Sequence, residues 1–228
     1  MKQLKYLLIS FGLLLSLGAC DKLLGGDVEE DPAISETMVG LWYDVQNKTQ
    51  VYFIYLREDR VMVSAYAEAM FGEVTTGSAV SSWMFTSDGQ ICIDESPLDG
   101  MYCEAGALYK KNYSSLEYEE MSRVYDPRKK VGPKVQNLTR RAWTGYVDNK
   151  IVTLKFDTDG TVTRTYKPNA GWEGEEEVLT CNYSTKDGVI YFEGLDEARA
   201  VTIKGNFSYN FLFADFGDVI VLMSDRPE

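Results

Sequence analysis

The chain has 228 residues, with 35 acidic residues against 23 Lys and Arg, so its formal net charge is −12. A surface this acidic repels nucleic acid phosphates, and we expect no nucleic acid partner. The sequence contains no His, which excludes Ser-His-Asp and Cys-His catalysis and most catalytic zinc sites. Carboxylate or Lys and Tyr chemistry remains open. We expect no metal, no cofactor and no enzyme activity.

Residues 1–19 have the features of a signal peptide. Lys2 and Lys5 supply its positive start. The apolar segment 6–17 that follows is shorter than the roughly 20 residues that cross a bilayer as a helix. The leader is therefore expected to be removed rather than to anchor the protein as a transmembrane helix.

Residues 17–20, Leu-Gly-Ala-Cys, close the leader and resemble the bacterial lipobox. The resemblance implies cleavage before Cys20 and lipidation of that Cys, so the membrane becomes a partner through the lipid anchor. An ordinary cleavage site with an accidental Cys is the alternative. Asp21 resembles the inner-membrane retention signal of enteric bacteria, which other Gram-negative groups do not follow, and we expect the outer membrane.

Residues 20–37 are expected to form a flexible acidic tether. Residues 21–37 hold six acids against one Lys, together with Gly25, Gly26 and Pro32. Such a composition buries little apolar surface and favours a hydrated, extended chain.

The remainder of the chain contains an internal repeat at an offset near 100 residues, with Trp42 matching Trp143 and Tyr66 matching Tyr166. This predicts two domains, at residues 38–124 and 138–228. Residues 125–137 join them and read as a basic linker rich in Pro, Gly and Lys or Arg.

Hydrophobic residues alternate with polar ones within each repeat. Residues 151–156 and 161–166 show this pattern on either side of the turn at 157–160, and residues 207–213 show it again. We expect about seven to eight short antiparallel strands per repeat and no helix outside the leader. The predicted fold class is therefore all-β, with two tandem small antiparallel barrels after the leader and tether.

Gly40-Leu41-Trp42 opens the first repeat and Arg123 closes it. This pairing resembles the lipocalins, in which a Gly-x-Trp strand is covered by an Arg from the end of the barrel. The resemblance implies two lipocalin-like barrels, with Trp42 paired to Arg123 and Trp143 paired to Arg226 as structural seals. The second repeat has Arg141 where the Gly is expected, and ordinary core aromatics with surface arginines are the alternative.

Two loops carry a large aromatic beside Gly and Glu: residues 67–79 with Phe71 and residues 167–177 with Trp172. Such loops at the end of a barrel often contact a ligand. Phe71 and Trp172 are therefore candidate ligand contacts, and folding of each ring back onto its own barrel is the alternative.

Cys92 and Cys103 flank a predicted hairpin loop, so a cross-strand disulfide between them is geometrically allowed, with free buried thiols as the alternative. Cys181 is best interpreted as a small core residue.

The expected function is non-catalytic binding of a small apolar or amphipathic ligand by a membrane-anchored lipoprotein. If side chains fill the barrels, the alternative is a protein-interaction or assembly subunit of the cell envelope. A carboxylate-based glycan hydrolase is a remote alternative, because it needs two acids about 5 to 9 Å apart across a cleft.

Overall fold

The computed structural model of the protein describes residues 28–45, 50–70, 73–112, 115–139, 142–195, 198–204, 210–216 and 219–224. The chain divides into two compact units, Met1–Met38 with Ser82–Glu120 and Val39–Ser81 with Met121–Glu228. The predicted leader and Cys20 lie outside the described residues. The repeat boundaries expected from the sequence stay predictions.

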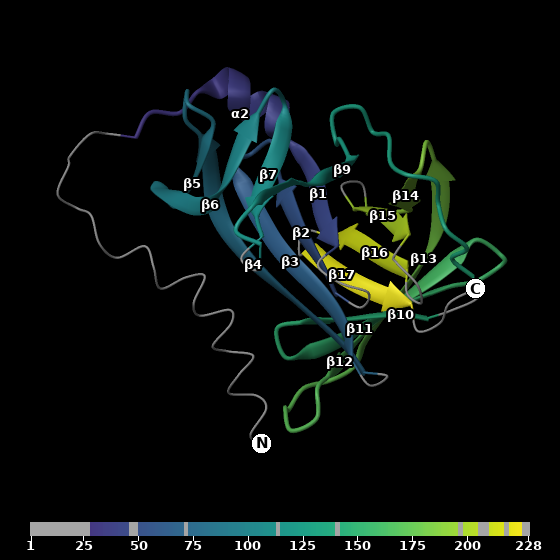
Figure 1. Cartoon of the computed structure of the whole chain (residues 1–228). Coiled ribbons are helices and arrows are strands. Elements are labelled where there is room, and N and C mark those ends of the chain that lie inside the picture. Colours follow the sequence, from purple (N-terminus) through teal and green to yellow (C-terminus); the bar gives the residue numbers. More distant parts are fainter. Residues whose placement is uncertain are drawn as a thin grey trace. The chain divides into compact units, whose positions relative to one another are not determined.

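The first unit contains the one helix among the described residues and four complete strands (Figure 1). These elements are α2 (Pro32–Met38), β5 (Gln90–Ile93), β6 (Ser96–Glu104), β7 (Ala107–Lys111) and β8 (Tyr118–Glu120), together with the end of β4 (Glu73–Phe85).

Helix α2 corrects the expectation that no segment outside the leader is helical. The side chain of Asp31 caps the helix, because its Oδ1 accepts the backbone N–H of Ala33 at 2.9 Å. The helix begins with a proline, whose missing N–H costs nothing at this position. The Oγ of Ser35 accepts the backbone N–H of Phe85 at 3.0 Å, which ties the helix to β4. A helix this short is unstable alone, so these contacts explain why an acidic segment becomes ordered.

The remaining strands of the first half belong to the second unit: β1 (Gly40–Val45), β2 (Gln50–Leu56), β3 (Val61–Met70) and β9 (Ser122–Tyr125). Nine strands hydrogen-bond in the order β8-β7-β6-β5-β4-β3-β2-β1-β9. The two end strands of this order, β8 and β9, are separated in the chain by Met121 alone. They are the two edges of this sheet.

The second half of the chain forms a closed antiparallel barrel of eight strands. They are β10 (Ala142–Val147), β11 (Lys150–Phe156), β12 (Thr161–Pro168), β13 (Glu177–Lys186), β14 (Val189–Phe192), β15 (Arg199–Lys204), β16 (Asn210–Asp215) and β17 (Val219–Ser224). Closure leaves no unpaired strand edge. The predicted all-β class with two small antiparallel barrels is confirmed.

Side chains fill the closed barrel. Trp143, Leu154, Phe156, Leu212 and Leu222 are each at most 1% exposed and belong to one apolar cluster. An eight-stranded barrel has room for little more than its own side chains. The part of the barrel around Trp143 is therefore a packed core.

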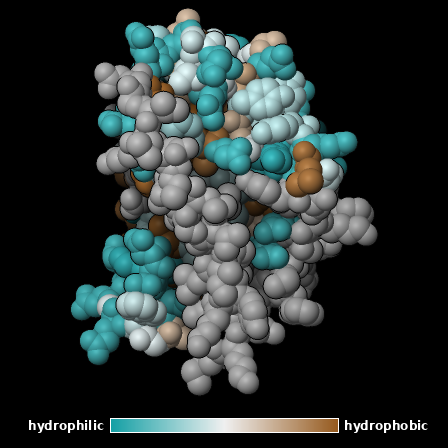
Figure 2. Space-filling view, turned by 60° about the vertical axis from the view of Figure 1, so that its left-hand side comes forward, coloured by the Kyte–Doolittle hydropathy of each residue, from teal (hydrophilic) through white to brown (hydrophobic). Residues whose placement is uncertain are grey.

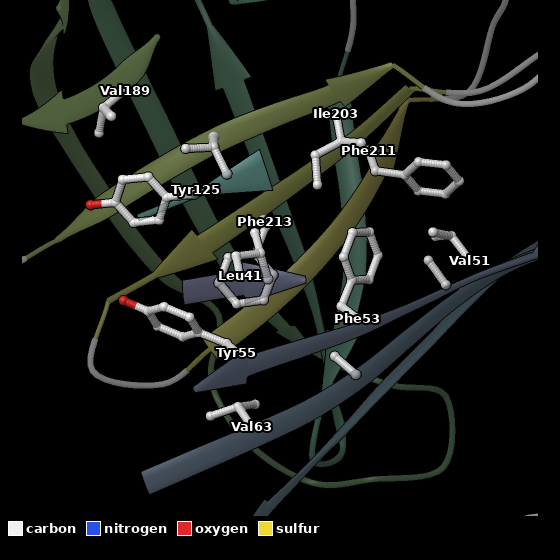
Figure 3. Close-up of a cluster of buried hydrophobic side chains, with 13 residues drawn as sticks. Leu41, Val51, Phe53, Tyr55, Val63, Tyr125, Val189, Ile203, Phe211 and Phe213 are labelled. Carbon is white, nitrogen blue, oxygen red and sulfur yellow. The ribbon is translucent and has the colours of Figure 1, made fainter. Parts of the chain in front are cut away.

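Strand β2 is buried on both faces. Phe53 and Tyr55 face the outer surface of β16, where Phe53 lies 6.0 Å from Phe211 and Tyr55 lies 5.3 Å from Phe213, measured between ring centroids (Figure 3). Ile54, which points to the opposite side of the sheet, is only 1% exposed. The strand therefore reads as a continuous apolar run rather than an alternating one.

Hydrophobic side chains on the face shown in Figure 2 are scattered among hydrophilic ones. Within the described ranges, the structure contains no helix that is long and apolar enough to span a membrane.

Candidate functional site

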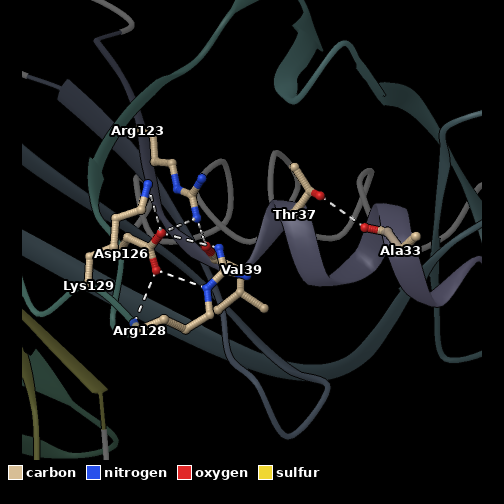
Figure 4. Close-up of polar contacts among 7 residues, drawn as sticks. All are labelled: Ala33, Thr37, Val39, Arg123, Asp126, Arg128 and Lys129. Carbon is tan, nitrogen blue, oxygen red and sulfur yellow. Dashed lines mark hydrogen bonds and ion pairs between the residues drawn. The ribbon is translucent and has the colours of Figure 1, made fainter.

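The structure brings Trp42 and Arg123 together. They are opposite each other in the β1–β9 register, and the Cζ of Arg123 lies 5.3 Å from the centroid of the Trp42 ring. Nη2 of Arg123 also donates to the carbonyl oxygen of Val39 (Figure 4). Trp42 is 2% exposed, so this guanidinium covers an otherwise buried indole.

Asp126, which is 7% exposed, forms ion pairs with the basic side chains beside the contact between Trp42 and Arg123. Its carboxylate pairs with Arg123 at 3.1 Å, with Arg128 at 3.0 Å and with Lys129 at 3.7 Å (Figure 4). Burial alone would raise the pKa of Asp126, but the hydrogen bond from Arg128 and the charge of Arg123 outweigh it and lower the pKa. Near the start of the predicted basic linker, the buried carboxylate of Asp126 therefore pairs with two basic residues of the same linker, Arg128 and Lys129.

Gly40 is required by the close approach of this Arg. Its φ is +153°, and a Cβ at this position would lie 2.7 Å from Nε of Arg123 and 2.8 Å from the carbonyl oxygen of Tyr125. No side chain fits there without a shift of the backbone or of Arg123.

Trp143 occupies in the second barrel the place that Trp42 has in the first sheet. Trp42 pairs with Ile54 across the first hairpin, and Trp143 pairs with Leu154 across the corresponding one. Trp143 is fully buried, and its Nε1 donates to the carbonyl oxygen of Leu138 at 3.4 Å. Its predicted partner Arg226 lies outside the described residues, as do Arg141 and Phe71.

Trp172 is 58% exposed and lies in the loop between β12 and β13. Its backbone N–H donates to the carbonyl oxygen of Asn169 at 3.0 Å, which shapes the loop. The ring is therefore exposed rather than packed in the core, and its role as a ligand contact stays a prediction.

The inner face of β12 carries a charged residue that the sequence analysis did not select. Arg164 is paired with the fully buried Leu154 on one side and with Leu179 on the other. Directly opposite residues in an antiparallel sheet point to the same face, so all three side chains face the barrel interior. Leu179 is nevertheless 36% exposed. The barrel interior is therefore open to solvent at the end where Arg164 and Leu179 lie.

Two aromatic rings hold the guanidinium of Arg164. Its Cζ lies 4.8 Å from the ring centroid of Tyr166 and 4.8 Å from that of Phe216. Its Nε is buried and has no hydrogen-bond partner, and no described carboxylate forms an ion pair with it. We call the half-buried or exposed inward-facing residues Arg164, Tyr166, Leu179 and Phe216 the open end of the second barrel.

A second cation lies beside the open end but is neutralised. Nζ of Lys150 is 5.6 Å from the Tyr166 ring centroid and 2.6 Å from Oε1 of Glu177. The hydrogen bond from Lys150 lowers the pKa of Glu177, and the charge of Arg164 lowers it further. Glu177 therefore stays ionised and bound to Lys150.

A signal for Arg164 was present in the alternating pattern. Val162 and Tyr166 mark the apolar face of this strand, and Arg164 stands between them in the same period. A charged residue at an inward position of a barrel strand is a candidate binding residue.

All three described cysteines are free thiols, and Cys92 and Cys103 are buried without a disulfide between them. Burial raises the pKa of Cys103 to about 11 and also raises that of Cys92. Both thiols therefore remain protonated and weakly reactive at neutral pH.

The first unit contains a cleft of about 390 Å³. It is lined by residues of α2, by the turn before β5 and by the turn after β6, including Asp31, Asp88 and Cys103. Its volume lies within the range of small-molecule sites. Hydrogen bonds from Thr86 and Gln90 lower the pKa of Asp88, which keeps this carboxylate ionised.

Within the described ranges, no group of three or more Cys, Asp or Glu side chains could hold a metal ion. Comparison with protein-family models and with curated proteins finds no match to this chain.

Proposed function

We propose that the protein is a bacterial envelope lipoprotein that binds a small amphipathic ligand, without catalysis, at the open end of its second barrel. The observation that carries the proposal is the exposure of Leu179 and the half-burial of Arg164 and Tyr166, although all three face the barrel interior. Inward-facing side chains that reach solvent are the usual lining of a barrel ligand site.

The ligand is expected to lie across the open end rather than deep inside the barrel. The core around Trp143 and Leu154 is already filled. Tyr166, Leu179 and Phe216 offer apolar surface, and the exposed Trp172 stands in the loop that joins β12 to β13. A ligand of limited size is therefore favoured.

The envelope location rests on residues 17–20 and their resemblance to the lipobox. Lipid on Cys20 would hold the protein on a membrane, which we propose to be the outer one. The test is fractionation of cells that carry Cys20→Ala: the variant should leave the membrane fraction or keep its leader, and an unchanged membrane association of a processed chain would contradict the lipid anchor.

An interaction subunit of the cell envelope is a second candidate function. The filled core of the closed barrel supports it, because such a barrel needs no ligand. Val178 at 60% and Trp172 at 58% exposure are large apolar side chains that a protein partner could cover.

The cleft in the first unit does not favour a glycan hydrolase. Such an enzyme needs one carboxyl group whose pKa is raised so that it can donate a proton. The pKa of Asp88 is lowered instead, and Asp31 accepts the N–H groups that begin α2. We therefore do not assign catalysis to this cleft.

Native mass spectrometry tests the binding function. The mature chain, Cys20 to Glu228, would be made without the leader so that no lipid is attached, and purified without detergent. A co-purifying adduct that is lost on denaturation, and that is weakened in Trp172→Ala, supports the proposal. A bare polypeptide mass after incubation with an envelope lipid extract would contradict it and favour the interaction subunit.

A further inference from the structure

We propose that Arg164 is the anchor for an anionic head group, so that the ligand of the second barrel is an amphiphile with a carboxylate. This inference rests on the proposed binding function and specifies its ligand class. It follows from the electrostatics of one side chain and from the surfaces around it.

The two arginines that stack on aromatic rings differ in whether other groups of the protein pair with them. Arg123 and Arg164 both lie over aromatic rings, and both have a buried Nε without a hydrogen-bond partner. Arg123 also pairs with Asp126 at 3.1 Å and donates to the carbonyl oxygen of Val39. Arg164 has no such acceptor among the described residues.

The buried Nε of Arg164, which has no hydrogen-bond partner, carries a desolvation cost that stacking offsets only in part. A carboxylate is the ligand that matches its planar fork of donors, through two parallel hydrogen bonds. The structure thus leaves a strong donor group unused at the place where the barrel interior meets solvent.

The strand register places one acid, Glu177, on the inner face beside Arg164. Glu177 forms its ion pair with Lys150, at 2.6 Å, and lies within the electrostatic reach of Arg164 without pairing with it. Glu173, Glu175 and Glu176 in the neighbouring loop are exposed. Salt largely screens the interaction between exposed charges that are more than about 8 Å apart. The interaction of a half-buried charge with a bound ligand is screened less.

The surfaces beside Arg164 fit an alkyl chain. Tyr166 and Phe216 lie on the guanidinium, and Leu179 faces it from β13. Apolar walls next to a single cation select a molecule that has one anionic end and one apolar end.

The test compares two probes that share an alkyl chain, decanoate and decanol, by calorimetric titration of the mature chain. Decanoate should bind about 10- to 100-fold more tightly than decanol, because a hydrogen bond to a charged group is much stronger than one to a neutral group. Arg164→Gln should bring the two affinities to within about twofold of each other.

The matched control is Lys155→Gln, which removes one positive charge from a side chain that is 67% exposed on the same barrel. It should leave the preference for decanoate unchanged. Arg164→Lys keeps the charge but loses the planar fork, so it should retain a weaker preference for decanoate; it also serves if Arg164→Gln does not fold.

Three outcomes are distinguishable. If neither probe binds to the wild-type chain, the proposed binding function itself fails. If both bind equally well, or if Arg164→Gln and Lys155→Gln reduce the preference equally, binding stands but the role of Arg164 is overturned.

Discussion

The guanidinium of Arg123 lies over the indole ring of Trp42, with its Cζ 5.3 Å from the ring centroid. One residue comes from the first strand of the nine-stranded sheet and the other from its last strand. The contact therefore joins the strand that begins the sheet along the chain to the strand that ends it. Asp126 holds the Arg with an ion pair of 3.1 Å.

Gly40→Ala should lower the free energy of unfolding by about 3 kcal/mol. The added Cβ would lie 2.7 Å from Nε of Arg123 and 2.8 Å from the carbonyl oxygen of Tyr125. Gly160→Ala is the control, because Gly160 also has a positive φ, +88°, but has no atom within 4 Å of its Cβ position. The control should cost about 1 to 2 kcal/mol from backbone strain alone. Equal losses in urea unfolding would contradict the steric role of Arg123.

Phe53→Ala should lower the free energy of unfolding by about 3 to 5 kcal/mol, as expected for a fully buried aromatic. Phe53 joins β2 to β16 through Phe211 and Phe213, so the hairpin β1–β2 and the closed barrel share one core. Tryptophan fluorescence and circular dichroism should therefore report one transition. Val80→Ala, at a side chain 69% exposed, should change stability by less than about 0.5 kcal/mol. Two separate transitions would show that the shared core does not couple them.

The protein should lose stability above about pH 10, in part through Tyr125. Burial raises the pKa of Tyr125 from 10.0 to about 12. The unfolded chain therefore releases this proton first, and the stabilisation present below pH 10 is lost as the pH rises toward 12. Burial also raises the pKa of Tyr55, whose hydroxyl points to the same side in Figure 3.

Tyr125→Phe removes one of these protons. Its urea midpoint should therefore fall less steeply with pH between 10 and 12 than that of the wild type. The same slope in both proteins would show that Tyr125 does not titrate differently in the folded and unfolded states.

Iodoacetamide should modify Cys92 and Cys103 slowly in the folded protein and rapidly after unfolding in urea. Both thiols are buried, and the pKa of Cys103 is raised to about 11, so little thiolate is present at neutral pH. Peptide mass spectrometry reads each site separately, and Cys181, which is only partly buried, serves as the internal comparison. Rapid labelling of Cys103 in the folded state, or a native disulfide between Cys92 and Cys103, would be inconsistent with this environment.

Much of the architecture could be predicted because it depends on short-range patterns. The alternation in residues 151–156 and 161–166 is a property of neighbouring residues, and these segments are strands β11 and β12. The same alternation would have placed Arg164 on the inner face of its strand, had each position been assigned to a face.

Other features depended on partners distant in the sequence. Helix α2 has a local start signal in Asp31 and Pro32, but it spans only seven residues, and the hydrogen bond between Ser35 and Phe85 holds it to β4. Residues 51–56 read as one apolar run, because Phe53 faces β16 while Ile54 faces the opposite side of the sheet.

By itself, the sequence determined that the protein is built from short antiparallel strands and lacks histidine chemistry, because periodicity and composition need no knowledge of long-range contacts. Only the tertiary structure decided that Asp126 forms an ion pair with Arg123 while no described carboxylate pairs with Arg164. Whether a charge is compensated depends on which side chains the fold brings within a few ångströms, and spacing along the chain does not contain that information.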